Sequence, residues 1–155
     1  MIRIDTINRL KKYFDIRELV SKDVYNKFGQ NAWKVFDSRL LETLLFIREQ
    51  LAVPIIVNNW KAGGPYSQRG FRENTAELVK SKTIAGRLYL SAHNIGCAVD
   101  FHSPKKSPDT IRKEIERMAI ALPHPIRLEN GKDAPTWVHV DVMVNDGDST
   151  KIVWF

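Results

Sequence analysis

Apolar residues recur at helical spacing in two long segments of the chain. The first segment begins at Asp37 or Ser38, either of which can cap a helix, and its wide apolar face continues to Leu51. The second has Ser107 as its N-cap and Pro108 in its first turn, and its apolar stripe ends before a pair of prolines. Both segments are predicted to be helices that pack one face into the core.

Weaker helical patterns occur in three other places. Residues 1–15 are expected to form an arm or a short helix, and residues 18–25 a short helix that Gly29 ends. Residues 75–87 are expected to be partly helical. Between residues 60 and 74 lies a loop with three glycines, one proline and two closely spaced arginines, and such long loops are often functional.

Runs of β-branched or alternating residues predict strands in five short segments, at residues 53–59, 96–102, 126–129, 136–144 and 151–155. Helices and strands that do not alternate regularly along the chain indicate an α+β fold. We expect one domain over residues 1–155, in which helices pack on one face of a small, mostly antiparallel sheet.

Strand alternation gathers polar side chains on one face of this predicted sheet. Asp100 and His102 share a face of one strand, and Trp137, His139 and Asp141 share a face of another. Histidine and aspartate side chains that point the same way from apolar strands need partners if they are buried. We therefore expect a site on the sheet face opposite the helices.

Three residues in or just before these predicted strands have the chemistry of metal ligands. His93, Asp100 and His139 supply two imidazoles and a carboxylate, which suit Zn²⁺. Three protein ligands leave one coordination position open, which is typical of a catalytic zinc site. Cys97 is the single cysteine of the chain, so a multi-cysteine zinc cluster is excluded.

The composition is that of a globular protein with a basic surface. Hydrophobic residues make up 43% of the 155 positions, and no run approaches the roughly 18 apolar residues of a membrane span. The formal net charge of +6 favours polyanionic partners such as bacterial cell wall, anionic membrane or nucleic acid. The basic residues are scattered and no nucleic-acid motif is present, so nucleic acid is not the expected partner. The N-terminal residues show no secretory signal, so synthesis in the cytoplasm is expected.

A ten-residue motif, Ser91-x-His93-x-x-Gly96-x-Ala98-x-Asp100, resembles the first signature of a peptidase family. The family comprises zinc D-alanyl-D-alanine carboxypeptidases and related peptidoglycan endopeptidases. It is grouped with lysostaphin-type peptidases and the hedgehog signalling domain in one zinc-site superfamily. The resemblance implies the α+β fold of that superfamily.

Two further stretches extend the resemblance over residues 16–144. Trp137-x-His139 resembles the second signature, and Gly70-Phe71-Arg72 stands where the family has Gly-Tyr-Arg. The resemblance implies that His93, Asp100 and His139 bind zinc. It also implies that Arg72, or Arg69 under another alignment, binds a substrate carbonyl or carboxylate. The remaining residues expected to support or line the site are Ser91, Trp137 and His102.

The sequence departs from the family at the general base. The family usually has an acidic residue three positions before the last histidine, and here that position is Thr136, which cannot act as a base. Glu129, Asp133 and Asp141 are the candidates for the missing base. Asp141 can alternatively orient a histidine ligand.

These observations predict a zinc-dependent peptidase that hydrolyses amide bonds in bacterial cell-wall peptides, as a D,D-carboxypeptidase or an endopeptidase. A basic domain without a signal sequence suits a phage or prophage lysis enzyme, an endolysin, acting as a monomer on peptidoglycan once it is released. The alternative is a zinc-binding or virion-associated binding module on the same scaffold, without catalysis. Nucleic-acid binding driven by charge is a third, weaker hypothesis.

Overall fold

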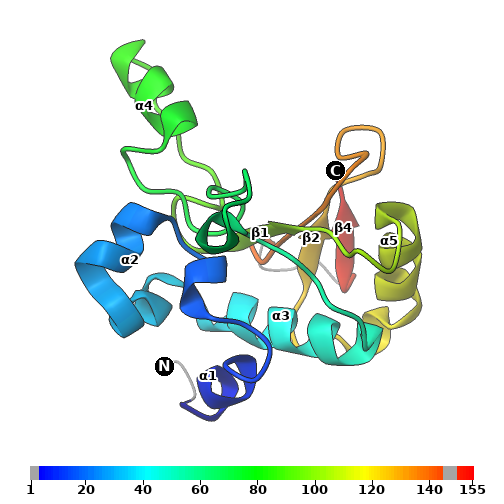
Figure 1. Ribbon diagram of the computed structural model, residues 1–155. Coiled ribbons are helices and arrows are strands. Elements are labelled where there is room, and N and C mark those ends of the chain that lie inside the picture. Colours follow the sequence, from blue (N-terminus) through cyan, green and yellow to red (C-terminus); the bar gives the residue numbers. More distant parts are fainter. Residues whose placement is uncertain (1–3, 145–149) are drawn as a thin grey trace.

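The computed structural model describes residues 4–144 and 150–155 as five α-helices and one four-stranded sheet, an α+β arrangement (Figure 1). The two predicted long helices are confirmed. Helix α3 (Ser38–Leu51) has Asp37 as its N-cap, and α5 (Pro108–Arg117) has Ser107 as its N-cap. In each case a side-chain oxygen accepts a hydrogen bond from a free N–H of the first turn.

Three shorter α-helices are found in the described part of the chain, in addition to α3 and α5. Helix α1 (Ile4–Leu10) packs against α3, and the helix expected near residue 18 is divided into a 3₁₀ turn (Ile16–Glu18) and α2 (Lys22–Phe28). Ser21 caps α2, and Gly29 ends it with a positive φ of 52°. Helix α4 (Glu77–Ile84) projects from the body of the molecule (Figure 1). None of the helices within the described residues is long and apolar enough to span a membrane.

Four short strands form one sheet in the order β1-β3-β2-β4, namely β1 (Ala98–Phe101), β2 (Ile126–Leu128), β3 (Val138–Asp141) and β4 (Ile152–Trp154). Strand β3 runs antiparallel to both β1 and β2, whereas β2 and β4 are parallel, so the sheet is mixed. Both edges of β3 are occupied by β1 and β2. The following strand therefore adds to the outer edge of β2, and it runs opposite to β3 as β2 does.

One face of the sheet belongs to the hydrophobic core. Alternate residues of β1 and β3 point into the core together with apolar residues of α3 and α5, and the set includes Val99, Phe101, Val138, Val140, Leu40, Leu44, Ile111 and Ile115. The opposite face carries the intervening residues, among them Asp100, His139 and Asp141. The core on one side of the strands thus fixes the position of the polar side chains on the other.

The prediction of a strand over residues 53–59 is wrong. The segment makes a single bridge, in which Ile56 and His102 exchange both backbone hydrogen bonds at 2.8 and 3.1 Å. Pro54 lacks an N–H, and the Asn58 N–H donates to the carbonyl of Glu18, so neither neighbour can extend a ladder. Ile55, Val57 and Asn58 of the segment are nevertheless buried.

Candidate metal centre

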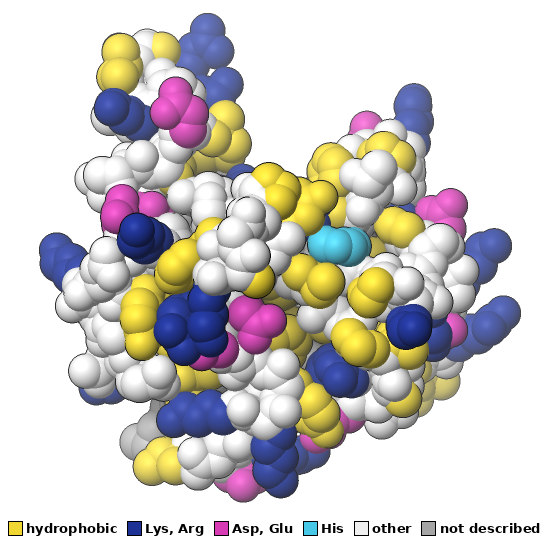
Figure 2. Space-filling view, in the orientation of Figure 1, with side chains coloured by type: hydrophobic (Ala, Val, Ile, Leu, Met, Phe, Trp, Pro, Cys, Tyr) yellow, Lys and Arg dark blue, Asp and Glu magenta, His cyan; other side chains and the backbone are white. Residues whose placement is uncertain are grey.

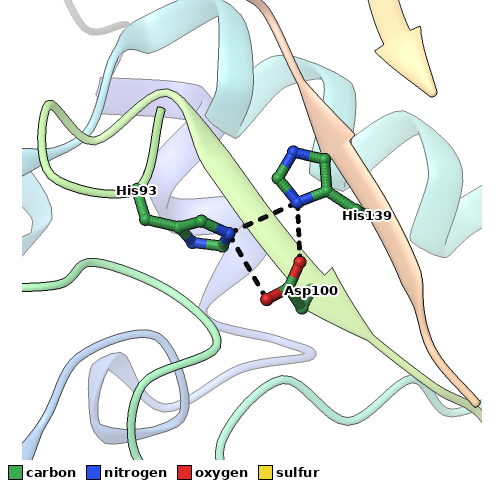
Figure 3. Close-up of side chains that lie close together, drawn as sticks. All are labelled: His93, Asp100 and His139. Atoms are coloured by element: carbon green, nitrogen blue, oxygen red, sulfur yellow. Dashed lines mark hydrogen bonds and ion pairs between the residues drawn. The ribbon is translucent and has the colours of Figure 1, made fainter. Parts of the chain in front are cut away.

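Three side chains from separate parts of the chain meet on the polar face of the sheet (Figure 3). His93 lies in the turn before β1, Asp100 lies in β1 and His139 lies in β3. Asp100 and His139 are direct partners in the antiparallel register of β1 and β3, which places their side chains next to each other. The predicted proximity of the three residues is therefore present.

The distances within the group are those of side chains that can share one ion. His139 Nδ1 lies 2.7 Å from Asp100 Oδ1, and His93 Nε2 lies 3.3 Å from Asp100 Oδ2. The two imidazole nitrogens, His93 Nε2 and His139 Nδ1, are 3.3 Å apart. One ligand atom from each residue lies within 4.8 Å of the others, close enough to hold a metal ion.

A backbone carbonyl fixes the ring of His93. Its Nδ1 lies 2.8 Å from the carbonyl oxygen of Gly70, which can only accept a hydrogen bond, so Nδ1 carries the proton. In the neutral ring Nε2 is then an acceptor, and it points at Asp100 and His139. Gly70 is required here because a Cβ would overlap the carbonyl oxygen of Leu19.

A carboxylate fixes the ring of His139 in the same way. Its Nε2 lies 3.1 Å from Asp141 Oδ2, and that carboxylate is fully buried and paired with Arg127 through two hydrogen bonds of 2.9 Å. Burial alone would raise the pKa of Asp141, but hydrogen bonds from His139 and Arg127 outweigh it and lower the pKa. The ionised Asp141 accepts a hydrogen bond from Nε2–H, which leaves Nδ1 of a neutral His139 as an acceptor.

The space between His93, Asp100 and His139 is therefore surrounded by hydrogen-bond acceptors, and a cation or proton must lie there to balance them. His93 Nε2, His139 Nδ1 and the carboxylate of Asp100 all converge, and two neutral imidazole lone pairs at 3.3 Å repel each other unless a proton or a metal ion lies between them. Burial lowers the pKa of His139, yet hydrogen bonds donated to Asp100 and Asp141, and the negative charges of these carboxylates, raise it to about 9. A proton therefore satisfies the group when no metal is bound, and a divalent cation would replace it.

Arg72 holds the carboxylate of Asp100 from the outer side. Its Nη2 donates to Asp100 Oδ2 at 3.1 Å, and its Nε donates to the carbonyl oxygen of Gln68 at 2.7 Å. Burial would raise the pKa of Asp100, but the contacts with His139 and His93 overcome that effect and hold the pKa well below its usual range. Asp100 is thus ionised and ready to bind a cation.

The motif between Ser91 and Asp100 forms the turn that carries His93. The side-chain oxygen of Asn94 accepts hydrogen bonds from Ser91 N and Oγ at 3.1 and 2.8 Å, and Asn94 Nδ2 donates to the carbonyl of Arg72. Gly96 has a positive φ of 73°, and a Cβ there would overlap the carbonyl oxygen of Val35. Ser91 therefore supports the ligand turn, as a partner of Asn94.

A cavity of about 310 Å³ opens beside the group. Its walls include Asp100, Arg72, Arg69, Trp137 and Tyr66. The Arg69 guanidinium stacks on the Tyr66 ring at 3.5 Å and lies 2.8 Å from Nδ1 of His102, the next polar residue after Asp100 on the same strand face. Arg69, Arg72 and Trp137 thus line one cavity, with His102 behind Arg69.

The three candidate bases occupy different positions. Glu129 donates its backbone N–H to the carbonyl of His139 at 3.3 Å, and it follows Arg127 by two residues, so its side chain lies on the face that Arg127 shares with Asp141 and His139. Asp133 is exposed in the connection between β2 and β3, where its carboxylate accepts from Asn130. Asp141 contacts Nε2 of His139, the nitrogen remote from the group, which suits orientation of that ring.

Several residues that shape the site lie outside the predicted set. Arg127 fixes Asp141, the Phe155 ring stands edge-on to His139 at 5.6 Å, and the buried Arg112 of α5 donates to the carbonyls of Glu129 and Trp137. Alternation in residues 126–129 could have placed Arg127 on the polar face. The roles of Arg112 and Phe155 depend on packing between distant segments, for which the sequence carries no local signal.

Comparisons of the chain with protein-family models, curated proteins and solved structures gave no match. The interpretation of the site therefore rests on its own geometry.

Proposed function

We propose that this protein is a zinc-dependent peptidase that hydrolyses amide bonds in bacterial cell-wall peptides, on a scaffold like that of the hedgehog domain and the D,D-peptidases. The observation that carries the proposal is the convergence of three acceptors on one point, with His93 and His139 each held in the required tautomer by an outer partner. Such outer hydrogen bonds accompany histidine ligands in metal sites.

The donor set fits zinc better than calcium or magnesium. Two imidazole nitrogens and one carboxylate oxygen are borderline ligands, whereas calcium and magnesium prefer oxygen alone. A zinc ion held by His93, Asp100 and His139 would polarise a substrate carbonyl and lower the pKa of a water molecule. The cavity beside Asp100 gives a substrate access to this position.

Glu129 is our choice for the general base. It faces the same side of the sheet as His139, directly across the β2–β3 pair, whereas Asp133 is turned to Asn130 in an exposed loop. The Glu129 carboxylate would take a proton from the attacking water and pass it to the nitrogen of the leaving amine. Thr136, the residue at the family's usual base position, is exposed and has no role in this mechanism.

Arginine side chains would bind the peptide. Arg72 and Arg69 line the cavity from the loop, and their N–H groups can donate to substrate carbonyl oxygens. Trp137 forms an apolar wall of the same cavity. The net charge of +6 favours an anionic cell wall, and we infer a phage or prophage lysis enzyme as the biological setting.

A binding module on the same scaffold is the second candidate. Thr136 at the family's base position favours it, because a domain that only holds zinc or binds the wall has no need for a base. The peptidase and the binding module differ in one property, because only the peptidase releases peptide fragments from the cell wall.

The test is digestion of purified peptidoglycan by zinc-loaded protein, with soluble fragments identified by mass spectrometry. We expect new amine and carboxyl termini with the wild type, and none with His93→Ala or after zinc removal by a chelator. Glu129→Gln should retain zinc but lose activity, whereas the matched Asp133→Asn should retain both. Zinc-loaded protein that binds the wall without releasing fragments would replace the peptidase by the binding module.

A further inference from the structure

We propose that the substrate groove continues from the metal centre across Arg72 onto helix α4, so that the substrate is a peptide extending on both sides of the cleaved bond. This inference rests on the proposed function and refines it: the enzyme would be an endopeptidase and not a carboxypeptidase. Two adjoining cavities and an unpartnered hydrogen-bond acceptor support it.

Two cavities meet at the loop before α4. The cavity beside Asp100 measures about 310 Å³, and a second one measures about 450 Å³. Gln68 and Arg72 line both, so the two spaces share one boundary. The far wall of the second cavity consists of residues at the base of α4, namely Ala76, Glu77, Leu78 and Ser81.

The surface is open along this direction. Figure 2 shows the molecule hollowed between the projecting α4 and the lobe on the right, where Figure 1 places the connection between β2 and β3. A histidine side chain is visible at the bottom of this hollow. A chain lying in the hollow would therefore run beside α4.

Gln68 offers a hydrogen-bond acceptor at the junction of the two cavities. Its Nε2 faces Glu73 Oε1 at 3.4 Å, which fixes the amide so that Oε1 is the other atom. Gln68 Oε1 is buried and has no hydrogen-bond partner among the described residues. Because Oε1 is closed to solvent, the Gln68 side chain must rotate toward the groove before a backbone N–H of an extended peptide can satisfy this acceptor.

Arg72 lies between the two cavities and has donors left for a substrate. Its Nε donates to the carbonyl of Gln68 and its Nη2 donates to Asp100. The N–H groups of Nη1 and the second N–H of Nη2 have no hydrogen-bond partner among the described residues. They can donate to a carbonyl oxygen of a peptide that passes from one cavity to the other.

The experiment compares cross-linked muropeptides with single stem peptides as substrates of the zinc-loaded protein, with products identified by mass spectrometry. We expect cuts that leave at least two residues on each side, and no release of a single C-terminal amino acid. Leu78→Asp and Gln68→Leu should each lower kcat/KM on the long substrate by about tenfold relative to kcat/KM on the shortest cleaved peptide. Leu88→Asp is the matched control, since Leu88 is 89% exposed on the same arm and does not line the cavity.

The outcomes separate this inference from the proposed function. Release of single terminal residues would overturn the inference and leave the peptidase intact. If nothing is cleaved, the proposed function fails, and the groove is judged by titrating the same peptides into metal-free protein. Tighter binding of the long peptide, weakened by Leu78→Asp but not by Leu88→Asp, supports the groove, and equal binding of long and short peptides overturns it.

Discussion

Asp141 shows how a residue without contact to the metal position can determine metal binding. Its carboxylate is fully buried and accepts hydrogen bonds from Arg127, from the backbone N–H of Met143 and from Nε2 of His139. These contacts fix the ring so that Nδ1 faces the centre. Outer partners of this kind contribute about 10- to 100-fold to metal affinity.

We therefore expect Asp141→Asn to weaken zinc binding by about 10- to 100-fold, because the amide is a poorer acceptor for the imidazole N–H. Competition with a chromophoric chelator measures the dissociation constant. Asp133→Asn removes a nearby acidic side chain that is exposed and bound to Asn130, so it should leave the constant unchanged. Equal affinities of Asp141→Asn and the wild type would show that Asp141 does not orient the ligand.

Glu129 and Asp133 can be distinguished as bases by their effects on turnover. We expect Glu129→Gln to lower kcat by about 10²- to 10⁴-fold, the usual contribution of a general base, with zinc affinity unchanged. Asp133→Asn should retain kcat within about twofold. Steady-state kinetics on a soluble cell-wall peptide measures both, and the reverse result would transfer the role of base to Asp133.

Residues near one another in the sequence were predicted best at this scale. His93 and Asp100 fall within one motif, and alternation places His139 and Asp141 on one strand face. Asp141 was predicted from the sequence as a residue that can orient a histidine. The contact of the Gly70 carbonyl with His93 and that of Arg127 with Asp141 were not predictable, because they depend on loop packing and strand register. The sequence could not select among Glu129, Asp133 and Asp141 as the base, because their positions also depend on strand register and loop packing.

At the scale of elements, the two long helices were predictable because their N-cap residues and apolar faces can be recognised in the sequence. Helices α3 and α5 begin at the caps that the sequence indicates, and their apolar faces cover the sheet. The run at residues 53–59 has a strand-like composition, yet its backbone groups pair with Glu18, His102 and a loop. The composition indicates burial of apolar side chains such as Ile55 and Val57, whereas the hydrogen-bond partners of the segment depend on the whole fold.

The role of Asp37 as the N-cap of α3 can be tested by the pH dependence of the stability of the fold. Its carboxylate accepts hydrogen bonds from Arg39 through the backbone N–H and the guanidinium, which lower the pKa of Asp37. Because the pKa is lower in the folded than in the unfolded state, the stabilisation is complete above the unfolded pKa of about 4 and is lost as pH falls through the folded value.

Asp37→Ala should accordingly lower the free energy of unfolding by about 1 kcal/mol at pH 7, since a helix cap is lost. Asp37→Asn retains a capping oxygen, so it should lose less at pH 7 and show a smaller decline in acid. Urea unfolding at pH 7 and at pH 3 measures these differences. Identical pH dependence of the wild type and Asp37→Asn would mean that the carboxylate contributes nothing as an ion.

At the scale of the whole molecule, the candidate metal centre joins parts of the chain that are distant in sequence. His93 precedes β1, Asp100 lies in β1, His139 lies in β3, and their outer partners come from the loop at Gly70 and from β2. An unfolded chain does not hold these groups together. A metal ion that binds the folded state alone stabilises it by mass action.

Zinc should therefore raise the melting temperature of the metal-free protein. At a free zinc concentration 100 times the dissociation constant, the gain is about 2.7 kcal/mol. For a chain of this length it corresponds to a rise of roughly 5–11 °C. Differential scanning calorimetry with and without zinc measures the shift, and His139→Ala should abolish most of it because two ligands bind zinc weakly. A rise of the same size in His139→Ala would place the ion elsewhere on the protein, and the absence of a rise in the wild type would remove the metal from the proposed function.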